Sequence, residues 1–162
     1  MHKAVVDPRD TKRICVTGGA GLYVTADSGA HWERWTSPDW AADVYPDGLV
    51  FNPRRPDVMF VSAAQHNPHT WHGSRFAGSR VYRSTDSART WEVLRNGLPD
   101  RMQGEVGALC LEDWGQSCSV FAATTHGEVY CSDNCGDQWS LVISGLAPIS
   151  KKGHDTLLSS VA

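Results

Sequence analysis

The chain has 162 residues, of which 41% are apolar, 20% are charged and seven are tryptophan, and its net charge is −3. This length and composition predict one ordinary globular domain with a real core, and they exclude a disordered chain. The small negative charge gives no reason to expect a polyanionic partner, so nucleic-acid binding is not predicted.

The sequence shows no segment that predicts membrane insertion or secretion. Its uncharged apolar runs fall far short of the ~20 residues that span a bilayer. Residues 1–10 lack the apolar core of a signal peptide and resemble a strand entering a turn. The default prediction is therefore a cytoplasmic location, with an extracytoplasmic one if the sequence is truncated at its N-terminus.

Residues 1–40 predict four short strands, which together make one repeat unit. A strand at 4–8 enters a turn and a second strand returns at 14–16. After a glycine-rich bend, a third strand at 22–26 leads into a tight turn, and a fourth leaves it at 31–36.

Two further units follow the same plan, at 41–100 and 101–148. The segment Asn52-Pro53-Arg54 of the second unit matches Asp7-Pro8-Arg9 of the first, which is an internal similarity independent of the tight turns. A loop at 65–79 is inserted in the second unit. Residues 149–162 form a C-terminal tail that is a candidate closing strand, although the first unit already has four strands.

A shared pattern occupies the tight turn of each unit: hydroxyl, x, Asp or Asn, x, Gly or Ala, x, polar, Trp. An Asp or Asn oxygen at the start of such a turn accepts backbone N–H groups, Gly supplies the left-handed backbone, and Trp buries a large ring. These residues are predicted to be structural and to bind no ligand. They are Thr25, Asp27, Gly29 and Trp32; Ser84, Asp86, Thr90 and Trp91; and Ser132, Asn134, Gly136 and Trp139.

This pattern resembles the Asp-box, or BNR repeat, of β-propeller proteins. Two copies depart from it, since Ala88 replaces Gly in the second, and Asn134 and Gln138 replace Asp and Thr in the third. The Cβ of Ala88 disfavours positive φ, so we expect an altered turn there. The resemblance implies an all-β fold of three four-stranded antiparallel blades, belonging to a six- or seven-bladed propeller.

The resembling group includes sialidases, xyloglucan-degrading hydrolases, sortilin-like receptors and photosystem II assembly factors. A sialidase site needs an arginine triad, but the usual Arg-Ile-Pro signature is absent. The arginines that would have to gather are Arg54, Arg75, Arg80 and Arg101. The leading interpretation is a noncatalytic binding or scaffold module for a protein or carbohydrate. The alternative is part of a glycoside hydrolase, sialidase-like or glucan-degrading, whose catalytic set is incomplete here.

A hydrolase of another type needs two carboxyl groups roughly 5–10 Å apart across a cleft. The loop carboxylates Asp43, Asp47 and Asp113 are the candidates for one member of such a pair. Asp113 is the most suggestive because the neighbouring Trp114 offers a ring for stacking on a sugar. A turn acid with a packed Trp is the simpler interpretation.

The inserted loop concentrates three histidines beside a tryptophan: His66, His69, Trp71 and His72. Pro68 is expected to preclude a regular helix, and no nearby Cys or acid supplies a fourth ligand, so neither a metal nor a cofactor is predicted. A polar surface loop is expected. It is still the segment most suited to binding, because loops on rigid scaffolds carry binding residues.

Five cysteines form no obvious disulfide framework. Cys15 and Cys110 lie in apolar strand-like runs and are expected to act as small hydrophobic residues. Cys131 and Cys135 face each other across part of the third tight turn, where they are either free or bonded.

Three blades leave two faces uncovered, whereas closed propellers have about 4–8 blades. Either the chain is the C-terminal part of a longer protein, or another copy completes the blades through self-association at these faces.

Overall fold

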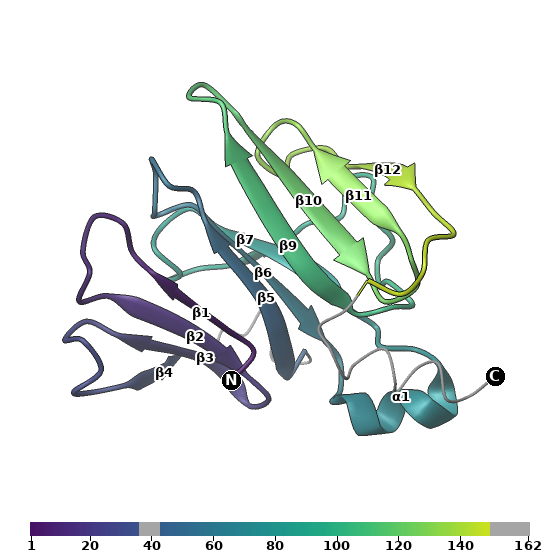
Figure 1. Cartoon of the computed structure of the whole chain (residues 1–162), viewed down its shortest axis with the longest axis horizontal. Helices are drawn as coiled ribbons and strands as arrows, with labels where there is room; N and C mark the ends of the chain where they lie inside the picture. The colour runs from purple at the N-terminus through teal and green to yellow at the C-terminus, as the bar shows by residue number, and fades with distance from the viewer. Residues whose placement is uncertain (36–42, 150–162) are drawn as a thin grey trace.

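The computed structural model describes residues 1–35 and 43–149, with the backbone alone for residues 72–74. Within them, twelve strands form three four-stranded antiparallel sheets, each with its strands in chain order (Figure 1). Each sheet is one propeller blade, so the predicted all-β fold is confirmed. Part of the predicted link before the second unit, and the predicted closing strand at 150–162, lie outside the described residues.

The strands of the three blades have the following bounds. Blade 1 contains β1 (Lys3–Val6), β2 (Ile14–Gly18), β3 (Gly21–Thr25) and β4 (Glu33–Trp35). Blade 2 contains β5 (Tyr45–Phe51), β6 (Met59–Ala64), β7 (Arg80–Ser84) and β8 (Glu92–Val93). Blade 3 contains β9 (Val106–Asp113), β10 (Cys118–Thr124), β11 (Val129–Ser132) and β12 (Ser140–Ile143).

Antiparallel pairing places alternate connections at opposite ends of the blades. We call one end the box end: it carries the turn from the first to the second strand of each blade and the tight turn from the third to the fourth strand. The helix end carries the connections from second to third strand, including α1 (Pro68–Ser74). In Figure 1, α1 lies at the bottom and the β9–β10 hairpin projects at the top, so the two ends are far apart.

The core lies between the blades, because each blade has two apolar faces. Successive strand residues point to opposite faces: on β6, Met59 packs with Cys15 of blade 1, and Phe60 packs with Val120 of blade 3. We call the face that meets the following blade in the chain the forward face, and the opposite one the rear face. Blade 2 therefore has both faces covered.

A buried hydroxyl group on the second strand joins each of the first two blades to the next. Thr17 Oγ1 donates to the Asp47 carbonyl at 2.7 Å, and Ser62 Oγ donates to the Val106 carbonyl at 2.7 Å. Ser62 also accepts the Gly48 N–H at 2.8 Å. These bonds satisfy the first-strand backbone where it would otherwise be buried without partners.

Helix α1 corrects the expectation of an irregular loop. Pro68 occupies the first helical turn, where the missing N–H has no intrahelical partner to lose, so proline starts the helix instead of preventing it. Trp71 is fully buried, donates Nε1–H to the His66 carbonyl at 3.1 Å and meets Tyr45 edge to face. The segment is therefore a packed element of blade 2.

Candidate functional site

The three tight turns, which we call the box turns, share one hydrogen-bond pattern. In the first, Thr25 Oγ1 accepts the Gly29 N–H at 3.0 Å and donates to Asp27 Oδ1 at 2.7 Å. In the others, Ser84 accepts the Ala88 N–H and Ser132 accepts the Gly136 N–H, both at 2.8 Å.

Each box turn needs two successive left-handed residues, and the second turn achieves this without glycine. Ser87 and Ala88 have φ of 65° and 69°, against 63° and 94° for Ser28 and Gly29. The expectation that Ala88 would alter the turn is therefore wrong. The bond from the Ala88 N–H to Ser84 and the burial of its methyl group offset the strain that positive φ imposes.

The box acids are committed to their own turns. The His31 backbone N–H and imidazole, with the Thr25 hydroxyl, hold the pKa of Asp27 far below its usual range. Hydrogen bonds from the Thr90 hydroxyl and backbone N–H lower the pKa of Asp86 to about 2. Both side chains are therefore ionised acceptors at neutral pH, and neither is poised to transfer a proton.

The box tryptophans differ in burial although their local geometry matches. Trp139 and Trp91 are 2% and 5% exposed, whereas Trp32 is 46% exposed. Trp32 and Trp139 both donate Nε1–H to the carbonyl of the box glycine, at 3.1 and 3.0 Å. The difference arises because Trp91 and Trp139 lie in the cores shared with the preceding blade.

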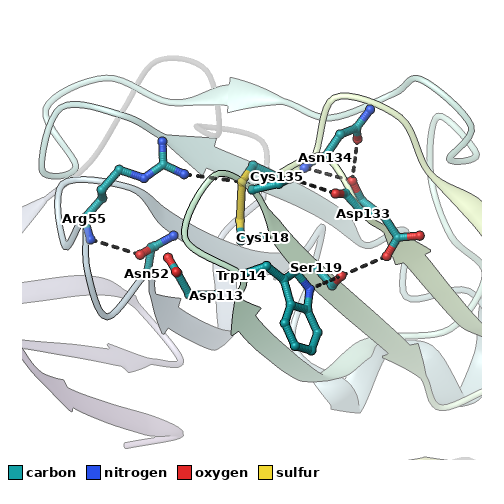
Figure 2. Close-up of a disulfide and its surroundings, with 12 residues drawn as sticks. Asn52, Arg55, Asp113, Trp114, Cys118, Ser119, Asp133, Asn134 and Cys135 are labelled. Atoms are coloured by element: carbon teal, nitrogen blue, oxygen red, sulfur yellow. Dashed lines mark hydrogen bonds between the residues drawn. A yellow bond between two sulfur atoms is a disulfide. The ribbon is translucent and has the colours of Figure 1, made fainter.

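The disulfide joins Cys118 to Cys135, so the alternative of a Cys131–Cys135 bond is wrong (Figure 2). In each blade the residue before the box Gly or Ala donates its N–H to a backbone carbonyl at the end of the turn between the first and second strands. The pairs are Ser28 to Lys12, Ser87 to Asp57, and Cys135 to Cys118. This bond brings the Cα atoms of Cys118 and Cys135 to 4.8 Å, a distance suited to a disulfide.

The other cysteines are free. Cys15 is buried as expected, but Cys110 is exposed on β9. Burial and the nearby Asp133 carboxylate raise the pKa of the Cys131 thiol to about 11. Cys131 therefore stays protonated at neutral pH and is a poor nucleophile.

We expect the Cys118→Ala/Cys135→Ser variant to lose about 3 kcal/mol of unfolding free energy, because the bond closes a loop with a sequence separation of 17. Urea denaturation measures this change. The circular dichroism spectrum should stay that of the wild type, since in blades 1 and 2 a backbone hydrogen bond without a disulfide joins the same two turns. A thiol reductant should destabilise the wild type and leave the variant unchanged; equal effects on both contradict the prediction.

Arginines from blade 2 surround the disulfide at the box end. Arg83 Nη1 donates to the Cys135 carbonyl and to Asp137 Oδ1, each at 2.6 Å. Arg55 Nη2 lies 3.5 Å from the Cys135 sulfur (Figure 2). These contacts hold the third box turn against blade 2, so both arginines link blade 2 to blade 3.

Asp113 and Trp114 lie at the tip of the β9–β10 hairpin. Asp113 Oδ1 accepts the Gly115 N–H at 2.7 Å and lies 3.2 Å from Arg54 Nε. Burial opposes ionisation, but the Gly115 N–H, Asn52 and the arginines lower the pKa of Asp113. Trp114 is exposed and donates Nε1–H to Ser119 Oγ at 2.9 Å.

Asp43 belongs to a buried ion cluster at the helix end. Arg101 Nη1 donates to Asp43 Oδ1 at 2.7 Å, Arg80 Nη1 lies 3.9 Å from Oδ2, and the Tyr82 hydroxyl donates to Oδ2. Burial and the hydrogen bond to Asp43 raise the pKa of Tyr82. Of the four arginines considered for a triad, Arg80 and Arg101 meet here, but Arg54 lies at the box end.

The histidine segment is exposed beside α1. His66 and His69 are exposed, and His72 belongs to α1 without a described side chain. Phe76, which follows the helix, is also exposed. Sequence reasoning missed Phe76, because no pattern in the sequence distinguishes it from a core residue. Among residues 1–35 and 43–149, no group of three His, Cys, Asp or Glu side chains is placed to hold a metal.

The structure does not bring the predicted binding residues together. Trp71 and the histidines lie at the helix end, whereas Asp113 and Trp114 lie at the box end (Figure 1). In the described part of the chain, the single helix is too short and polar to cross a membrane.

Comparisons with known proteins identify the class of fold. No model of a known protein family matches the chain, and neither does any curated protein. Similar solved structures include an ancestral GH74 enzyme, with a TM-score of 0.68 and 19% identity over 87% of this chain and 19% of that one. The fold is that of β-propeller blades.

Two further similar structures are of YCF48. YCF48 from Cyanidioschyzon merolae has a TM-score of 0.61 and 18% identity, covering 88% of this chain and 39% of its own. YCF48 bound to D1 peptide has a TM-score of 0.60 and 16% identity, covering 90% and 44%. The chain thus spans less than half the length of each of these structures.

Proposed function

We propose that this chain is a noncatalytic β-propeller module of the Asp-box type, which presents a binding surface for a protein or carbohydrate ligand. The observation that carries the proposal is the burial of the three carboxylates considered for hydrolysis. The side chains of Asp43 and Asp47 are each 1% exposed, and that of Asp113 is 3% exposed.

Burial and pairing make these carboxylates unsuited to glycoside hydrolysis. Two carboxyl groups must flank the scissile bond at roughly 5–10 Å, with one able to donate a proton. Asp43 is held by two arginines and Asp113 by Arg54. Asp43 and Asp113 also belong to opposite ends of the blades, so they cannot form the pair.

The helix end is the proposed contact surface. Trp71 anchors α1 in the core through its packed ring and its hydrogen bond to the His66 carbonyl. The exposed side chains of His66, His69 and Phe76 are thereby presented on a fixed element. An aromatic ring beside polar groups on a rigid element suits either a peptide or a sugar.

The disulfide is evidence on the cellular compartment of the protein. Disulfides persist in oxidising compartments and are rare in the cytosol. The Cys118–Cys135 bond therefore favours an extracytoplasmic or otherwise oxidising compartment over the cytoplasmic default.

Hydrolysis and binding assays test this function. We expect the purified chain to release no reducing sugar from xyloglucan or mixed-linkage β-glucan, and no sialic acid from sialyllactose. We expect it to bind probes on a glycan array or a peptide array, with the signal lost in His69→Ala/Phe76→Ala. The matched control is Arg89→Ala, an exposed change at the box end. Hydrolysis by the wild type that Asp113→Asn abolishes, with the fold retained, contradicts the proposal and supports the hydrolase alternative.

A further inference from the structure

The forward face of blade 3 carries apolar side chains at positions that are covered in the other two blades. One equivalent position on the second strand of each blade lies directly after the residue that pairs with the box hydroxyl residue. It is occupied by Cys15, Phe60 and Phe121. Cys15 and Phe60 are both 0% exposed, because the next blade covers them, whereas Phe121 is 37% exposed. Ile143 on β12, which pairs with Val129 on the same side, is also exposed.

The rear face of blade 1 shows the complementary difference. Trp32 is 46% exposed where Trp91 and Trp139 are buried against the preceding blade. Val6 is also exposed, and it pairs with Ile14, the rear-face counterpart of the fully buried Met59. The described chain therefore presents one uncovered forward face and one uncovered rear face.

The two junctions inside the chain show which surface covers a forward face. At both of them, a forward face packs against the rear face of another blade. We propose that the forward face of blade 3 docks on the rear face of blade 1 of a second copy, and that two such junctions close a ring. Two sets of three blades give six, within the range of about 4–8 for closed propellers.

The proposed junction lacks one polar contact that both internal junctions have. Thr17 and Ser62 donate to the carbonyl of the next blade, but the same position on β10 is Ala123. The junction between copies therefore lacks this hydroxyl bond. It should dissociate on dilution while the internal junctions hold.

Light scattering on the purified chain, across a dilution series, tests the proposal. We expect a discrete species of twice 17.7 kDa that dissociates on dilution. Phe121→Lys on the forward face and Val6→Glu on the rear face should each raise the dissociation constant at least about a hundredfold, because each buries an unpaired charge at both junctions. The matched control is Leu141→Lys, an exposed position on β12 that pairs with the rear-face residue Tyr130.

Mixing the two variants identifies the pairing. In a mixed pair both substitutions fall at one junction, where Phe121 and Val6 take the places of Phe60 and Leu111 at the internal junction, and the other junction is wild type. We therefore expect the equimolar mixture to recover a dimer that neither variant forms alone. A wild-type monomer at every concentration overturns the proposal and points to blades from another or a longer polypeptide. Open-ended aggregation, or loss of dimer in Phe121→Lys but not in Val6→Glu, overturns it too.

Discussion

Replacing Trp139 by alanine should lower the unfolding free energy by about 3–5 kcal/mol, which is the range for removing a fully buried tryptophan. The ring is 2% exposed and packs between blades 2 and 3 with Phe60 and Leu94. Its loss removes core contacts from two blades and leaves a cavity at their junction. Urea denaturation followed by far-ultraviolet circular dichroism measures the change.

Trp32→Ala is the matched control, because the box turn, its carbonyl acceptor and the strand that follows are equivalent. Half of the ring is already in water, so we expect a loss of only about 1 kcal/mol. Both variants should be measured at a concentration where the chain is monomeric. Equal losses from the two substitutions contradict the idea that the interblade contact, and not the turn, sets the contribution of this residue.

Replacing Asp43 by alanine should also cost about 3–5 kcal/mol, because it leaves the largely buried guanidinium group of Arg101 without its counter-charge. Arg101 loses its 2.7 Å bond to Oδ1, and the buried Tyr82 hydroxyl loses its acceptor. The link that Asp43 forms between the start of blade 2 and the segment leading into blade 3 disappears as well. The free energy of unfolding and its urea midpoint measure the effect.

Asp100→Ala supplies the comparison, since Asp100 also pairs with Arg80, at 3.0 Å, but is largely exposed. Exposed ion pairs contribute about 0–1 kcal/mol, and salt screens them. The loss in Asp100→Ala should therefore be small and should shrink at high salt, whereas the loss in Asp43→Ala should persist. A salt-sensitive loss in Asp43→Ala is the result that contradicts a buried pair.

Local chemistry accounts for the parts of the fold that could be predicted. Each box turn is built within five positions from a hydroxyl residue, an acid or amide residue, and two left-handed residues. Its pattern can therefore be recognised in the sequence wherever it recurs. The strands on either side are only two to five residues long, and their apolar pattern also needs no distant partner. For this reason the three four-stranded blades followed from the sequence, and the resemblance to known propellers added their arrangement.

Some local expectations failed because a second local effect was stronger. Pro68 was expected to exclude a helix, but a proline in the first turn loses no hydrogen bond, and Trp71 anchors the helix from inside the core. Ala88 was expected to disturb its turn, but the bond to Ser84 and the burial of its methyl group offset the cost of positive φ.

Only the tertiary structure decided the remaining features, because they depend on residues far apart in the chain. Asp43 meets Arg101 across 58 positions, and Cys135 finds Cys118 and not the nearer Cys131. The burial of a box tryptophan depends on whether another blade lies against it, which no local pattern encodes. The sequence by itself thus determined the blades, and the packing of blade on blade decided which residues are core and which are left as surface.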